Sequence, residues 1–111
     1  AGIHFVKVLR ELGLHDDLAP RLHGYPNGAR AMEALAISRG SGLIGGTQVT
    51  EINATPGVTL VGTLPAPFEL ATTYAVAVCS SAHEPELAQR FVQMLAGPDS
   101  LQLRRQAGFE P

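Results

Sequence analysis

The stretch NGARAMEALAISRGSGLIGGTQ, residues 27–48, decides the expected fold of this chain. After a polar residue and a glycine it runs with helical spacing as far as Arg39 and breaks at Gly40, and the apolar residues 43–46 then predict a short buried strand. A helix that starts after Asn27 leaves its first backbone N–H groups without helical partners, and their partial positive charge suits an anion. This order of loop, helix and strand indicates a binding site rather than a catalytic one.

The candidate ligand-binding residues of this stretch lie at the start of the helix and after the strand. They are Asn27, Gly28, Ala29, Arg30, Thr47 and Gln48. A second interpretation stays open, in which Asn27 only caps the helix and Gly28 only eases the turn. The two interpretations are hard to separate because a cap and an anion site use the same N–H groups.

Composition favours one globular unit. Of the 111 residues, 45% are hydrophobic and 16% are charged, which is enough for one modest core. The net charge is −2, and the eight Lys and Arg residues are scattered along the chain. We therefore expect no nucleic-acid partner and no anionic-membrane surface.

Outside the central stretch, helices and strands are predicted to alternate. A helix over residues 2–12 should end at Gly13, strands are predicted at 58–64 and 72–79, and two helices should follow Pro85. This alternation predicts an α/β fold with a mainly parallel sheet flanked by helices.

The sequence shows no familiar catalytic or metal-binding pattern. The four histidines lack metal-ligand spacing, and no G-x-S-x-G nucleophile motif is present, so we expect no metal, no cofactor and no enzymatic activity. Glu33, Glu51 and Glu69 are far apart in sequence and are interpreted as solvated. Cys79 follows an apolar run and is expected to be a small buried residue.

An ordered series of segments resembles the C-terminal half of the molybdate-binding-protein-like family, the periplasmic substrate-binding proteins of ABC importers. Its main segments are Ala31–Leu35, Gln48–Ile52, Pro56–Val58, Tyr74–Val78 and Ala107–Phe109. The match extends over essentially the whole chain but over only about half of the family's usual length. We therefore expect the chain to be part of a longer polypeptide.

The resemblance implies a partial type II periplasmic-binding-protein fold in which two lobes close on a ligand. Residues 1–72 would form an α/β segment of the second lobe, and residues 73–111 a crossover strand and a helical hairpin that packs on the first lobe. It also implies a periplasmic or extracytoplasmic location and ABC importer membrane subunits as partners.

By the same resemblance, the ligand is a small oxyanion such as molybdate or tungstate, held by N–H groups and hydroxyls. Ala1 and Gly2 would open a helix at the ligand, and the segment 27–30 would give a further N–H group. Gln48 stands where the family has a tyrosine, and an amide donates a hydrogen bond with a different reach from a phenol. A related oxyanion or another small ligand is therefore equally compatible with this chain.

Two further expectations remain. The same fold also serves as the ligand-sensing effector domain of transcriptional regulators, which is the alternative function. We also expect the chain to form a homo-oligomer, because Leu87, Phe91 and Leu95 would otherwise expose apolar surface.

Overall fold

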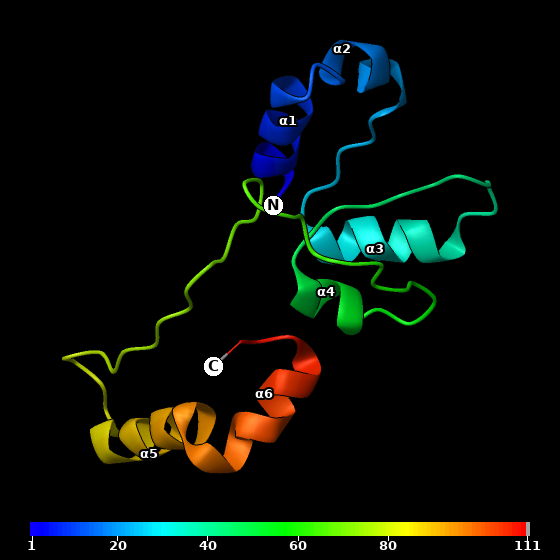
Figure 1. The fold of residues 1–111 in the computed structure, drawn as a ribbon. Coiled ribbons are helices and arrows are strands. Elements are labelled where there is room, and N and C mark those ends of the chain that lie inside the picture. The colour runs from blue at the N-terminus through cyan, green and yellow to red at the C-terminus, as the bar shows by residue number, and fades with distance from the viewer. Residues whose placement is uncertain (111) are drawn as a thin grey trace. The chain divides into compact units, whose positions relative to one another are not determined.

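The computed structural model describes residues 1–110 and consists of helices joined by long irregular segments (Figure 1). In chain order the elements are α1 (Gly2–Glu11), α2 (His15–Leu18), the 3₁₀ turn η1 (Ala19–Arg21), α3 (Gly28–Ile37), α4 (Val49–Asn53), α5 (Pro85–Ala96), the 3₁₀ turn η2 (Pro98–Ser100) and α6 (Leu101–Ala107). The chain divides into a first unit, Ala1–Leu70, and a second unit that begins at Ala71. None of the described helices is both long and apolar enough to cross a membrane.

The predicted parallel sheet is wrong, because residues 1–110 contain no strand. The segments expected to pair, 43–46, 58–64 and 72–79, are irregular, and within them Ile44 and Val61 have exposed fractions of 79% and 88%. β-branched residues favour an extended backbone, but a strand also needs a neighbouring segment in register to supply its ladder hydrogen bonds. The sequence pattern reports the first requirement and not the second. Cys79, expected to be buried, is exposed.

The end of α1 is formed by local signals that the sequence shows clearly. Gly13 has a φ of 69°, a left-handed conformation that glycine adopts without steric cost. The N–H of Leu14 donates to the carbonyl of Leu9 at 2.9 Å, and the N–H of Gly13 donates to that of Arg10 at 3.0 Å. These two bonds form a Schellman motif, and the prediction that the helix stops at Gly13 is confirmed.

The core of the first unit lies on the inner face of α3 and on one face of α1. The buried apolar residues are Val8, Leu9 and Met32, of which Met32 is 2% exposed. A methyl group on Gly45 would lie 2.6 Å from Cε of Met32, so the backbone of the irregular segment packs directly on α3. The predicted outward position of Glu33 is confirmed by its exposure.

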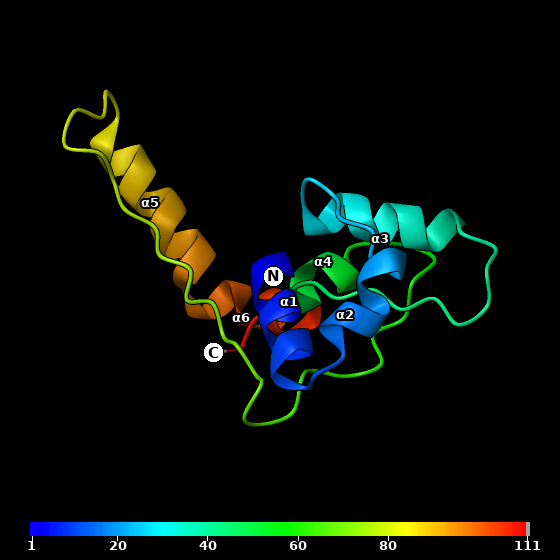
Figure 2. The same ribbon diagram turned by 90° about the horizontal axis from the view of Figure 1, so that it is seen from above.

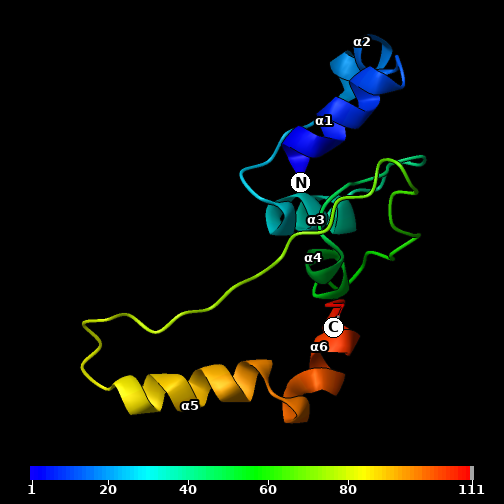
Figure 3. The same cartoon turned by 60° about the vertical axis from the view of Figure 1, so that its left-hand side comes forward.

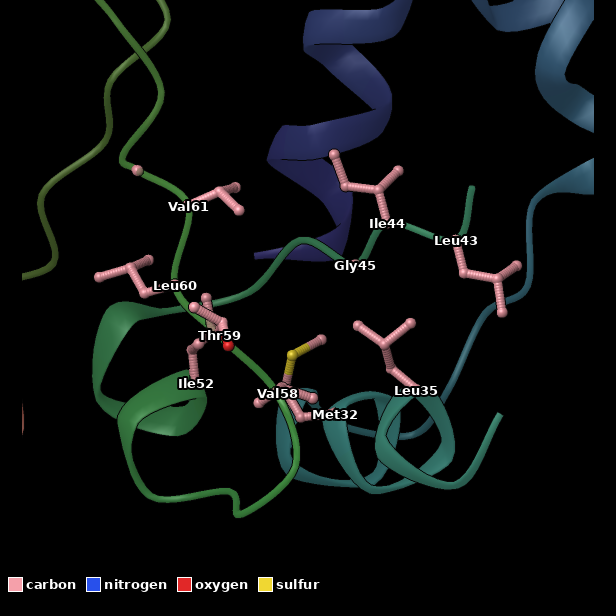
Figure 4. A pocket seen from close by; sticks show the side chains of 11 residues that line it. Met32, Leu35, Leu43, Ile44, Gly45, Ile52, Val58, Thr59, Leu60 and Val61 are labelled. Carbon is pink, nitrogen blue, oxygen red and sulfur yellow. The ribbon is translucent and has the colours of Figure 1, made fainter. Parts of the chain in front are cut away.

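A small pocket of about 120 Å³ opens beside this core (Figure 4). In Figure 4, Met32 and Leu35 from α3 lie on one side, and Leu43 and Val58 belong to the irregular segments that face them. The labelled lining residues are almost all apolar.

The second unit contains α5, η2 and α6. Pro85 occupies the first turn of α5, as predicted, and Arg104 satisfies carbonyl groups at its far end. The Arg104 guanidinium donates to the carbonyl oxygens of Leu95 at 2.6 Å and Gly97 at 3.0 Å, and it also contacts the Ser100 hydroxyl. This end of α5 is therefore capped by a side chain from α6.

The apolar face of α5 is largely uncovered. Leu87 is 62% exposed and Phe91 is 55% exposed, as expected from the sequence. Phe109 makes an edge-to-face contact with Tyr74 at a centroid distance of 5.6 Å, which fastens the chain beyond α6 to the segment that precedes α5.

Candidate functional site

The start of α3 has the geometry predicted for a capped helix. Asn27 is the N-cap residue, in an extended conformation with φ −156° and ψ 170°, and its Oδ1 accepts the N–H of Arg30 at 2.9 Å. Within residues 1–110 no partner is described for the N–H groups of Gly28 and Ala29. The cap and the open donors are thus both present at this helix start.

The start of α4 lies against the start of α3. The Thr47 hydroxyl donates to Oε2 of Glu51 across one turn. A side chain on Gly28 would overlap both of these groups, so the glycine allows Thr47 and the Glu51 carboxylate to reach the first turn of α3. The predicted residues Gly28 and Thr47 are therefore brought together.

The first turn of α1 also reaches this region. A methyl group on Gly46 would lie 3.2 Å from Cδ2 of Phe5, so Phe5 packs on the backbone just before α4. Figures 1, 2 and 3 agree that the N-terminal end of α1 lies near α4 and the starting end of α3. The starts of three helices consequently gather around residues 46–48.

The other predicted site residues contribute less to this arrangement. Ala1 is the N-cap residue of α1 without a side-chain hydrogen bond, and Ala1 and Gly2 are exposed. Gln48 is the N-cap residue of α4 and is half-buried beside Thr47. Arg30 extends into solvent and donates to Glu33 at 2.8 Å. Its charge is thus already matched on α3, and the open donors of the site are backbone N–H groups.

Glu51 is the site residue that the sequence interpretation missed. It was interpreted as solvated, whereas its carboxylate is held by Thr47 beside Gly28. A weak local signal exists, because an acidic residue three positions after a helix cap favours a helix start. The contact with Gly28 joins residues 23 positions apart, and no local pattern reports it.

The described histidines and acidic residues do not form a metal-like cluster. Within residues 1–110 no group of three His, Cys, Asp or Glu side chains could hold a metal ion. His4 instead bonds to the carbonyl oxygen of Phe68 at 2.7 Å, and His15 contacts Asp16 at 3.2 Å.

Comparison with known proteins assigns the chain to a family. A family model described as bacterial extracellular solute-binding protein matches residues 1–110. The chain belongs to this family. Membership supports a location outside the cytoplasm, and the predicted class of solute-binding protein is confirmed at this level.

One curated relative of this solute-binding chain is an aconitate isomerase from Pseudomonas sp, which is 32% identical over 75 residues. The aligned region covers 68% of the chain and 29% of the isomerase, so the chain spans less than a third of that relative. No solved structure matches the chain.

Proposed function

We propose that this chain is part of a solute-binding protein that holds a small anionic solute at the starts of α1 and α3 and presents it, chemically unchanged, to an ABC importer. The observation that carries the proposal is the meeting of Gly28 with Thr47 and Glu51 beside open N–H groups. The match to the extracellular solute-binding family supports a solute-binding role.

The donors at this place suit carboxylate or oxyanion oxygens. The N–H groups of Gly28 and Ala29 lie at the positive end of a ten-residue helix, and the Thr47 hydroxyl next to them would turn its O–H from Glu51 to the bound anion. Arg30 is paired with Glu33, so binding would use neutral donors instead of a free cation.

Glu51 narrows the class of solute. A carboxylate beside the binding donors repels a second negative charge, with a Coulomb energy of about 4 kcal/mol for unit charges about 4 Å apart at an effective dielectric constant of about 20. Molybdate and tungstate each carry two negative charges, and the Glu51 carboxylate repels both charges of either anion. A solute with one anionic group at the helix start and a hydroxyl or protonated group toward Glu51 fits better. Small acids with one carboxylate and one hydroxyl group have this form.

Calorimetric titration of the chain with molybdate, tungstate, sulfate, phosphate, lactate and aconitate tests the proposal, and lactate is the member with one carboxylate and one hydroxyl group. We expect at least one of these anions to bind, and Thr47→Val to weaken it about tenfold because it removes a donor and keeps the side-chain shape. Thr63 is exposed in an irregular segment, so Thr63→Val is the matched control and should leave affinity unchanged. Absence of binding for all six anions would refute the proposal.

A second candidate function is isomerisation of a small polycarboxylate, favoured by the likeness to the aconitate isomerase. Under this alternative the chain would contribute part of a site that moves a proton on the bound acid, and Glu51 is the carboxylate nearest the proposed donors. Proton NMR of aconitate incubated with the chain separates the two functions. Conversion between the cis and trans isomers above the rate in buffer would favour the enzyme, whereas binding without conversion favours the solute-binding protein.

A further inference from the structure

His4 makes a long-range hydrogen bond that the solute site does not use. Its Nε2 lies 2.7 Å from the carbonyl oxygen of Phe68, a residue 64 positions later. This bond therefore ties two distant parts of the first unit together.

The partner of His4 lies where the chain leaves the first unit. We call residues 64–70 the exit segment, because the first unit ends at Leu70. Within it only Leu64 and Phe68 are partly covered, and residues 69–77 are all exposed. Phe68 also donates its N–H to the Pro65 carbonyl at 2.8 Å, which holds its peptide group in a turn. The exit segment thus has few attachments, and His4 supplies a polar one.

The same turn of α1 touches the proposed solute site. Phe5, next to His4, packs on Gly46, which lies directly before Thr47. In Figure 1 the segment that leaves the first unit passes beside the start of α1. A shift of this turn would therefore change contacts both at the solute site and at Phe68.

We propose that His4 is a positioning residue that fastens the exit segment to α1 and couples it to the solute site. The coupling rests on the proposed function, whereas the fastening does not. If a solute orders the first turn of α1, it also orders the exit segment through His4, and by linkage a fastened exit segment favours the solute.

The chemistry of the bond identifies suitable variants. A carbonyl oxygen can only accept, so Nε2 of His4 must carry the proton. A glutamine amide can donate to the same oxygen, whereas a phenylalanine ring fills a similar space without a donor. His4→Gln should therefore keep the fastening, and His4→Phe should lose it. His23 is exposed, and His23→Phe is the control for placing a phenylalanine elsewhere in the first unit.

Hydrogen exchange followed by mass spectrometry measures the fastening without ligand. In His4→Phe we expect the amide of Phe68, which donates to the Pro65 carbonyl in the exit segment, to exchange about fivefold faster than in the wild type, while the amides of α5 are unchanged. His4→Gln and His23→Phe should both resemble the wild type. Equal exchange of the exit segment in His4→Phe and His23→Phe, or equally fast exchange in His4→Phe and His4→Gln, would overturn the inference.

Adding saturating aconitate, or the anion that binds best by calorimetry, tests the coupling. The anion should slow exchange of the exit segment in the wild type and in His4→Gln, and should leave it unchanged in His4→Phe. Slowing of equal size in His4→Phe would refute the coupling and leave the fastening intact. Failure of every anion to bind the wild type would remove the proposed function and the coupling together, while the ligand-free exchange still decides the fastening.

Discussion

Gly28→Ala is expected to destabilise the chain, against the usual effect of this substitution in a helix. Alanine favours a helix over glycine by about 1 kcal/mol, so α3 considered alone should gain stability. The tertiary structure opposes this gain, because the added methyl group would overlap the Thr47 hydroxyl and the Glu51 carboxylate. The sign of the change in unfolding free energy therefore tests the packing of α3 against α4.

The expected magnitude follows from the bond that must break. Moving Thr47 and Glu51 apart loses a hydrogen bond to a charged group, worth about 1.5–3 kcal/mol, and these half-buried groups belong at the lower end of that range. Forcing Thr47 from its rotamer adds about 1 kcal/mol. After subtraction of the helix gain, Gly28→Ala should lower the unfolding free energy by about 1–2 kcal/mol.

Urea unfolding followed by far-UV circular dichroism measures this difference. Gly2→Ala is the matched control, because Gly2 also opens a helix and an added methyl group there has no neighbour within 4 Å. The double variant Gly28→Ala with Thr47→Ala should be less destabilised than the sum of the two single variants, because both remove the same hydrogen bond. A Gly28→Ala variant as stable as Gly2→Ala would refute the described contact.

Three further outcomes are expected. Asn27→Ala should lower the unfolding free energy by about 1 kcal/mol through loss of the cap, as measured by the same unfolding assay. An unchanged unfolding free energy would contradict the role of Asn27 as a cap. Glu51→Gln should strengthen binding of a dianion such as sulfate by about tenfold to a thousandfold relative to a monoanion in calorimetry, the upper end being the full Coulomb energy of about 4 kcal/mol. An unchanged ratio would contradict the charge argument. Light scattering over a dilution series should detect self-association that Phe91→Glu weakens, and a monomer at every concentration would contradict it.

The elements that could be predicted from sequence are those specified by local chemistry. Asn27, Gly13 and Pro85 are start or stop signals that act within one helical turn, and each lies at the expected helix end. The strands failed because a ladder needs a partner from another segment, which composition does not reveal. The short helix α4 was missed because five residues carry little periodicity.

The donors and the selectivity of the proposed site have different origins. The open N–H groups exist wherever a helix starts, so the capping residue Asn27 was enough to locate them. The charge that would choose among anions comes from Glu51, which reaches the same place only because residue 28 has no side chain. A site built in this way can change its preferred solute through residues 28, 47 and 51 while the helix start that binds it stays the same. Gln48, which departs from the pattern of the molybdate-binding family, lies next to Thr47 and thus beside the residues that would set this preference.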